Sequence, residues 1–227
     1  MQAKRLTSRV LAALLRYPDA AFRAAVPELL QALDAERALP AARLAELATL
    51  LRELQAADPL EGEARYVETF DRGRATSLHL FEHVHGDSRD RGPALVDLGQ
   101  TYARAGLLLR GDELPDHLSV ALEFISTQPD DVAAGFLGEV EHILQAVFSA
   151  LRERGSPYAC VVAGVLELAG LKARAVPVAA EQTMDEGWAE PIAFDGCSAA
   201  GQARPGASQP IHIVRTQRAG PAQGARA

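Results

Sequence analysis

The chain has 227 residues, of which 48% are hydrophobic and 5% aromatic, and its formal net charge is −7. This length suits one domain with an appendage, and it is enough to bury a core without disulfides. An acidic surface disfavours nucleic acid and anionic lipid as partners, because both bind basic faces. No apolar stretch approaches the roughly 20 residues of a membrane-spanning helix, so stable membrane insertion is not expected.

The cysteines and the first residues indicate the compartment. Cys160 and Cys197 lie far apart and form no CxxC pair, so neither a disulfide framework nor a zinc knuckle is expected. The apolar run near the start is interrupted by Arg16 and Pro18 and has no small-residue cleavage site. The sequence therefore predicts no signal peptide, and the cytoplasm is the expected location.

Apolar residues recur every three or four positions along most of the first 175 residues, which predicts helices. The first four are expected at 7–16, at about 19–37, from Pro40 and from Pro59. Asp58 directly before Pro59 is a strong start signal, since an aspartate caps a helix and proline suits its first position.

The remaining helices are expected further along the same pattern. They are a short one at about 77–85, one from Pro93, one from Pro115, a long one from Pro129 that ends before Gly155, and a last one at about 157–170. No strand-type alternation persists in this part. The predicted fold is an all-α bundle of about eight to nine helices.

The composition changes after Ala175. Residues 176–227 are rich in Gly, Pro, Ala and Gln without sustained periodicity, which predicts a mostly disordered tail. Two apolar pieces, around Trp188 to Phe194 and around Ile211, are candidate docking segments. The expected organisation is a helical domain at 1–175 and a flexible C-terminal tail at 176–227.

Histidines concentrate in the middle third of the chain. His79-x-x-Glu82-His83 has the form of the inverted zinc-protease motif, in which two imidazoles four residues apart hold one zinc ion and the glutamate acts as base. A zinc-dependent hydrolase is therefore the alternative function. Leu80 and Val84 in this stretch equally suit a helix that packs one side on the core. Histidines of a binding surface, or purely structural histidines, explain the pattern more simply than a zinc site.

Two further polar segments follow. Asp87-Ser88-Arg89-Asp90-Arg91 is typical of a solvated, self-paired turn, or it presents arginine to an anionic group. In Glu113-Leu114-Pro115-Asp116-His117, a helix start explains Pro115 and Asp116 but leaves His117 unexplained. There is no GxSxG nucleophile motif and no phosphate-binding GxxxxGK[ST] loop, and apolar neighbours make Cys160 an unreactive thiol.

Three of these stretches together resemble a known family. SLHLFEHVHGDSRDRGPALVDL, YARAGL and ELPDHLSVALEFIS are similar to the nitrate reductase molybdenum cofactor assembly chaperones, the NarJ group of the TorD-like redox-enzyme maturation chaperones. The resemblance extends from about Arg5 to Leu171. The segments around Trp188 and Ile211 also resemble parts of longer members.

The resemblance implies an all-helical cytoplasmic chaperone without catalytic turnover. Its partner would be the immature catalytic subunit of respiratory nitrate reductase, recognised by its N-terminal segment, with cofactor-delivery proteins as further candidate partners. The chaperone would bind no cofactor permanently, but would assist insertion of molybdopterin guanine dinucleotide into that subunit. Family members link the Pro-Asp-His element, here Pro115, Asp116 and His117, to handling of partner or cofactor.

The hypothesis is therefore a partner-binding surface whose imidazoles and carboxylates face outward and whose apolar contacts accept a peptide helix. No residue is expected to be catalytic or to hold a metal. The predicted partner-binding residues are His79, Glu82, His83, His85, Asp87, Arg89, Asp90, Arg91, Tyr102, Glu113, Pro115, Asp116, His117, Leu118, Glu123 and Phe124.

Overall fold

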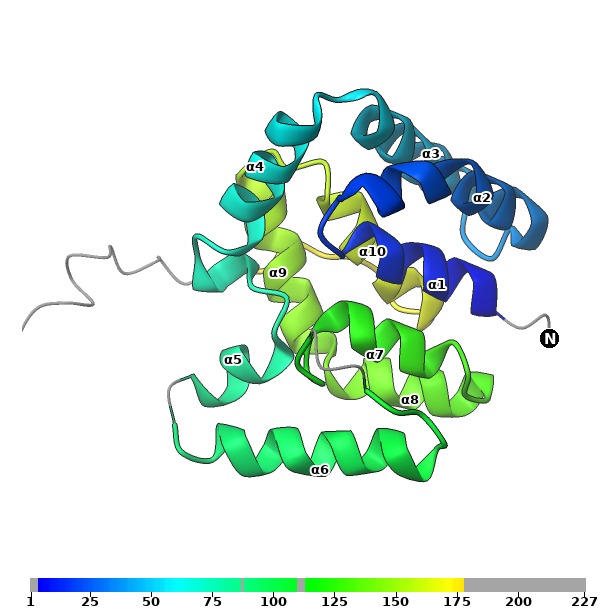
Figure 1. Ribbon diagram of the computed structural model, residues 1–227. Helices are drawn as coiled ribbons and strands as arrows, with labels where there is room; N and C mark the ends of the chain where they lie inside the picture. Colours follow the sequence, from blue (N-terminus) through cyan, green and yellow to red (C-terminus); the bar gives the residue numbers. More distant parts are fainter. Residues whose placement is uncertain (1–3, 87, 110–112, 178–227) are drawn as a thin grey trace, which may run out of the picture. The chain divides into compact units, whose positions relative to one another are not determined.

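The computed structural model describes residues 4–86, 88–109 and 113–177 (Figure 1). These residues form ten α-helices, one short 3-10 helix and no strand, which confirms the all-α class. The elements in chain order are α1 (Arg5–Leu14), α2 (Ala20–Glu36), α3 (Ala41–Ala56), α4 (Pro59–Phe70), η1 (Arg74–Thr76), α5 (Leu80–His85), α6 (Arg91–Arg104), α7 (Leu118–Ile125), α8 (Asp130–Glu139), α9 (Glu141–Glu153) and α10 (Ala159–Leu168). Trp188, Phe194 and Ile211 lie outside the described residues, so the domain division and the tail stay predictions.

The helix starts follow the sequence signals. The side chain of Asp19 accepts a hydrogen bond from the amide of Phe22 at 2.7 Å and so caps α2. The side chain of Asp58 accepts from the amides of Leu60 and Glu61 at the start of α4. Each carboxylate satisfies amides that have no partner within the helix, which is why these helices begin where predicted.

Helix α1 lies at the centre of the described core. It packs against α2, α7 and α10, and Figure 1 shows it between α2 and α7. Leu11 of α1 and Leu15 directly after it are fully buried. Gly164 of α10 allows a close approach, because a Cβ atom added there would lie 3.3 Å from the Leu11 side chain. Helix α1 therefore connects α2 to α7 and α10 within the core.

Three predicted boundaries are wrong, and the first is that of the helix expected from Pro115, which begins at Leu118 after its cap His117. The long helix expected from Pro129 is two helices, because the chain leaves helical geometry at Val140 (φ −99°, ψ 9°). Glycines at 135 and 138 weaken the helix before this point, and α8 packs against α7 whereas α9 packs against η1. This break accounts for ten helices where eight or nine were expected.

The short histidine-bearing helix begins at Leu80 and not at Ser77. The amide of Leu80 donates to the carbonyl of Asp116 at 3.0 Å, and the amide of Leu118 donates to the carbonyl of Leu78 at 2.9 Å. These bonds form an isolated antiparallel bridge centred on His79 and His117. Extended pairing here replaces the first helical turn that the sequence predicted.

Across residues 4–86, 88–109 and 113–177, every helix is too short or too polar to cross a bilayer.

Candidate functional site

A buried carboxylate lies at the centre of the polar cluster. Asp116 has an exposed fraction of 0%. One of its oxygens accepts from His79 Nδ1 at 3.2 Å, while the other accepts from the Phe81 amide at 3.1 Å and lies 3.7 Å from Arg91 Nη2. Burial opposes ionisation, but the hydrogen bond and charge of His79, the amide and Arg91 outweigh it and hold the pKa of Asp116 below its usual value.

His117 is also buried, with an exposed fraction of 6%, and it occupies the N-cap position of α7. Its Nδ1 lies 2.7 Å from Ser119 Oγ and 3.3 Å from the Ser119 amide nitrogen. Burial lowers the pKa of His117 to about 4, so this ring is neutral at physiological pH. The capping role explains the histidine that the sequence left without a reason.

His79 and His117 face each other. Their ring centroids are 5.1 Å apart, with an interplanar angle of 72°. A ring nitrogen from each and a carboxylate oxygen of the exposed Glu113 all lie within 4.8 Å of one another. The hydrogen bond to Asp116 raises the pKa of His79 against the opposing effect of burial. Three ligand-type side chains therefore converge from two segments.

Glu82 and His83 are directed to a different place. A carboxylate oxygen of Glu82 accepts from Ser77 Oγ at 2.6 Å, and His83 Nε2 donates to the Ser77 carbonyl at 2.9 Å. Burial lowers the pKa of His83. Among the described residues, the converging set is His79, Glu113 and His117, so the inverted zinc-protease arrangement predicted with Glu82 and His83 does not form.

The charged turn is only partly self-paired. Ser88 Oγ donates to a carboxylate oxygen of Asp90 at 3.2 Å, and Arg89 is exposed. Arg91 instead points to buried Asp116, and its Nε is buried without a hydrogen-bond partner. Asp87 lies outside the described residues.

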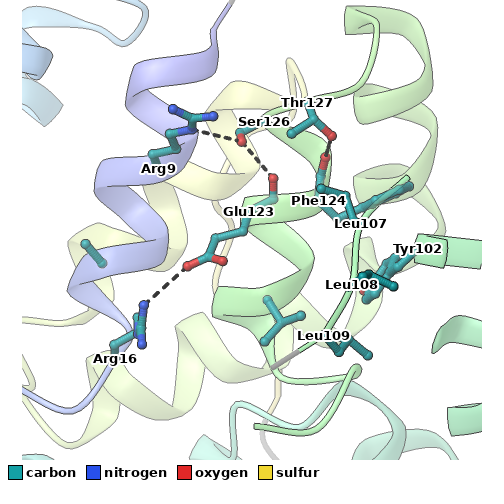
Figure 2. Close-up of a pocket in the computed structure, with 12 residues that line it drawn as sticks. Arg9, Arg16, Tyr102, Leu107, Leu108, Leu109, Glu123, Phe124, Ser126 and Thr127 are labelled. Carbon is teal, nitrogen blue, oxygen red and sulfur yellow. Dashed lines mark hydrogen bonds and ion pairs between the residues drawn. The ribbon is translucent and has the colours of Figure 1, made fainter. Parts of the chain in front are cut away.

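An open pocket of about 410 Å³ lies beside this cluster, between α1, α7 and the segment that follows α6 (Figure 2). Its lining residues are Arg9, Ala13, Arg16, Tyr102, Leu107, Leu108, Leu109, Val120, Glu123, Phe124, Ser126 and Thr127. Leu108 is 89% exposed. A leucine this exposed beside an open apolar pocket is typical of a surface that another molecule covers.

Charged side chains of α1, of the residues just after it and of α7 line the same pocket. Arg16 forms an ion pair with Glu123 at 3.5 Å, and both side chains are more than half exposed. Arg9 Nε donates to Ser126 Oγ at 3.4 Å. Figure 2 shows these groups on one side and the leucines on the other. An exposed ion pair of this kind contributes little to folding and is free to exchange partners.

Tyr102 connects the pocket to the polar cluster. Its hydroxyl donates to the Pro115 carbonyl at 2.9 Å, next to Asp116. Its ring, also buried, packs against Phe124 with a centroid distance of 4.6 Å. The pocket wall and the segment that carries Asp116 and His117 are thus one packed unit.

Asp87 lies outside the described residues and Asp116, His117 and Leu118 are buried, while the other predicted partner-binding residues fall into three groups. Tyr102, Glu123 and Phe124 line the pocket. Glu113 and the turn residues Arg89 and Asp90 are exposed on the surface. The half-buried ones are His79, Glu82, His83, His85, Arg91 and Pro115.

One expectation is wrong: Asp116 and His117 do not face outward, because both side chains are buried and the Asp116 carboxylate and His117 Nδ1 are bonded within the fold. Leu118 beside them is a buried core residue.

The side of the pocket formed by α1 and by Leu107 to Leu109 was not predicted from the sequence. The helix predicted at 7–16 was interpreted only as a core helix, although Arg9 and Arg16 lie seven residues apart in it and would share one face. The signal that could have found the pocket is the run of three leucines directly after Gly106, where the helix pattern has already ended.

Comparison with known proteins gives a consistent result. The family model described as nitrate reductase delta subunit matches residues 17–163. The nitrate reductase molybdenum cofactor assembly chaperone NarJ of Escherichia coli K12 is 45% identical over 160 residues, which is 70% of this chain and 68% of that protein. A protein of Bacillus subtilis named as a probable chaperone of the same kind is 31% identical over 159 residues, 69% of this chain and 84% of that one.

The fold also matches a solved structure. A crystal structure from Archaeoglobus fulgidus, described as a candidate redox enzyme maturation protein, aligns with a TM-score of 0.53 and 18% identity. The alignment covers 72% of this chain and 91% of that one. At this identity the similarity concerns the helical fold alone.

Proposed function

The chain belongs to the nitrate reductase delta subunit family, and we propose that it is an assembly chaperone, not an enzyme, for respiratory nitrate reductase. The observation that carries this role is the 45% identity over 160 residues to a protein named as a nitrate reductase molybdenum cofactor assembly chaperone. The chaperone binds the immature catalytic subunit in the cytoplasm and keeps it competent for insertion of molybdopterin guanine dinucleotide. It holds no cofactor permanently and leaves the finished enzyme.

The proposed binding surface is the pocket between α1 and α7. It combines apolar walls with charged groups that are accessible to a second molecule, and its volume of about 410 Å³ suits a few side chains of a peptide. The exposed Leu108 and Leu109 support this choice, because together they form contiguous apolar surface beside the pocket, and such surface marks interaction sites.

The proposed occupant is the N-terminal segment of the catalytic subunit, bound as an amphipathic helix. Apolar side chains on one face of such a helix enter the pocket, and its polar groups meet Arg9, Arg16 and Glu123. The apolar contacts supply most of the affinity, whereas the charges orient the helix and speed association. A chaperone must release its client, so moderate affinity suits the role.

The polar cluster then has a supporting role. Asp116 and His117 fix the start of α7, and α7 supplies Val120, Glu123 and Phe124 to the pocket. Of the predicted residues around the cluster, the exposed Arg89 and Glu113 remain candidates for direct contact.

Calorimetric titration of the full chain with the N-terminal peptide of the catalytic subunit tests this function. We expect one peptide per chain and a negative heat-capacity change, because apolar surface becomes buried. A scrambled peptide of identical composition is the control, since it keeps the charge but loses the apolar face. Absence of binding at peptide concentrations up to about 100 μM, or equal affinity for the scrambled peptide, would contradict the proposed mode.

A further inference from the structure

We propose that His79, His117 and Glu113 form a binding site for one divalent transition-metal ion of the zinc class. A ring nitrogen of each histidine and a carboxylate oxygen of Glu113 lie within 4.8 Å of one another. A tetrahedral ion with bonds of about 2.1 Å places its ligand atoms about 3.4 Å apart. The three ligand atoms must therefore move closer together when an ion binds, and the exposed Glu113 side chain is the freest of them to move.

The backbone fixes the two imidazoles relative to each other. The hydrogen bonds from Leu80 to Asp116 and from Leu118 to Leu78 place His79 and His117 opposite each other in an antiparallel bridge. Metal binding therefore needs no large rearrangement of the chain at these two positions, and less conformational entropy is lost when the ion binds.

Buried Asp116 directs His79 toward a metal. Its carboxylate accepts from Nδ1, which leaves the lone pair of Nε2 for an ion. A carboxylate behind a ligating histidine is the usual arrangement in zinc sites, because it fixes the ring and increases its basicity. The same pair has a purely structural use, but that use does not require a second histidine and a glutamate beside the ring.

The surroundings of His117 suit the same geometry. In the helix cap, Nδ1 accepts from the Ser119 amide, so metal binding requires a change of tautomer: Nδ1 then carries the proton and donates to Ser119 Oγ at 2.7 Å, and Nε2 ligates the ion. Two nitrogen donors and one oxygen donor favour zinc, cobalt, nickel or copper over magnesium or calcium. Three protein ligands leave one coordination position for water or for a donor from another molecule.

Zn²⁺ titration of the full chain against a chromophoric chelator tests the site, with Co²⁺ as a spectroscopic probe. We expect one ion per chain with a Kd below about 10 μM, and the visible absorption of tetrahedral Co²⁺. Glu113→Gln removes an exposed ligand and leaves the fold intact, while His117→Asn removes the imidazole and keeps a good helix cap. Each variant should weaken Zn²⁺ binding at least tenfold.

Two matched controls locate the ion. Glu82→Gln changes a nearby carboxylate that bonds Ser77, and it should leave Zn²⁺ affinity unchanged. A Cys197→Ser, His212→Gln double variant removes donors outside the described residues and should also bind normally. Absence of stoichiometric binding, unchanged affinity in both ligand variants, or loss of binding in either control would overturn the proposal.

Discussion

Replacing Leu108 by Ala tests whether the pocket between α1 and α7 binds the partner peptide. Leu108 is 89% exposed in the free protein, so the change should alter the free energy of unfolding by less than about 0.5 kcal/mol. Complete burial of a leucine side chain contributes about 1.5–3 kcal/mol, and alanine retains part of that. We therefore expect a loss of about 1–2 kcal/mol in binding, which raises the peptide Kd about 5- to 30-fold.

Isothermal calorimetry with the N-terminal peptide of the catalytic subunit measures this change. The matched control is Val96→Ala, which truncates an apolar side chain of α6 that is 60% exposed and does not line the pocket. The control should bind the peptide as the unmodified chain does. Equal Kd values for the Leu108 variant and the unmodified chain would refute the assignment of the pocket, and equal weakening by both variants would indicate a different apolar surface.

Three further predictions concern stability and reactivity. Asp116→Ala should lower the free energy of unfolding by about 3–5 kcal/mol in urea denaturation, because it leaves a buried ion-pair network without its anion, while exposed Asp90→Ala should change it by less than about 0.5 kcal/mol. Asp19→Ala should lower the free energy of unfolding by about 1 kcal/mol, because the α2 cap is lost. An unchanged free energy of unfolding would show that the cap does not stabilise the protein. In a Cys197→Ser background, Cys160 of the folded protein should react with a thiol reagent at pH 8 at least about a hundredfold more slowly than Cys160 of the urea-unfolded protein, because burial raises its pKa to about 12. Equal rates in the two states would show that the fold does not shield this thiol.

The parts of the fold that the sequence predicted depend on local chemistry. Asp19 and Asp58 cap helices through amides two or three residues away, and such signals do not need knowledge of the tertiary structure. The break at Val140 was missed because the apolar pattern continues through it, although Gly135 and Gly138 weaken the helix before it and α7 packs against α8 whereas η1 packs against α9.

The candidate site was less predictable than the fold. The clustering of His79 with His117 depends on pairing between two distant segments, in which His79 bonds Asp116 37 residues further along, and no periodicity reveals this pairing. Charged residue types suggested an exposed surface, yet Asp116 is buried because a histidine, an arginine and a backbone amide satisfy its charge. The pocket combines α1 with the segment after α6, and that contact arises only in the folded chain.

Helix α7 connects the polar cluster to the pocket, and this connection predicts an indirect effect. Val120 and Phe124 lie one turn apart on α7 and line the pocket, while buried Asp116 and the His117 cap determine where that helix begins.

We therefore expect the folded fraction of Asp116→Ala to bind the peptide more weakly than the unmodified chain, although Asp116 is too buried to touch a peptide. Arg89→Ala, an exposed change in the nearby turn, is the comparison for direct contact. Peptide titration at a temperature where both variants are folded separates the two effects. Normal peptide affinity of folded Asp116→Ala would show that the cluster stabilises the bundle without shaping the pocket.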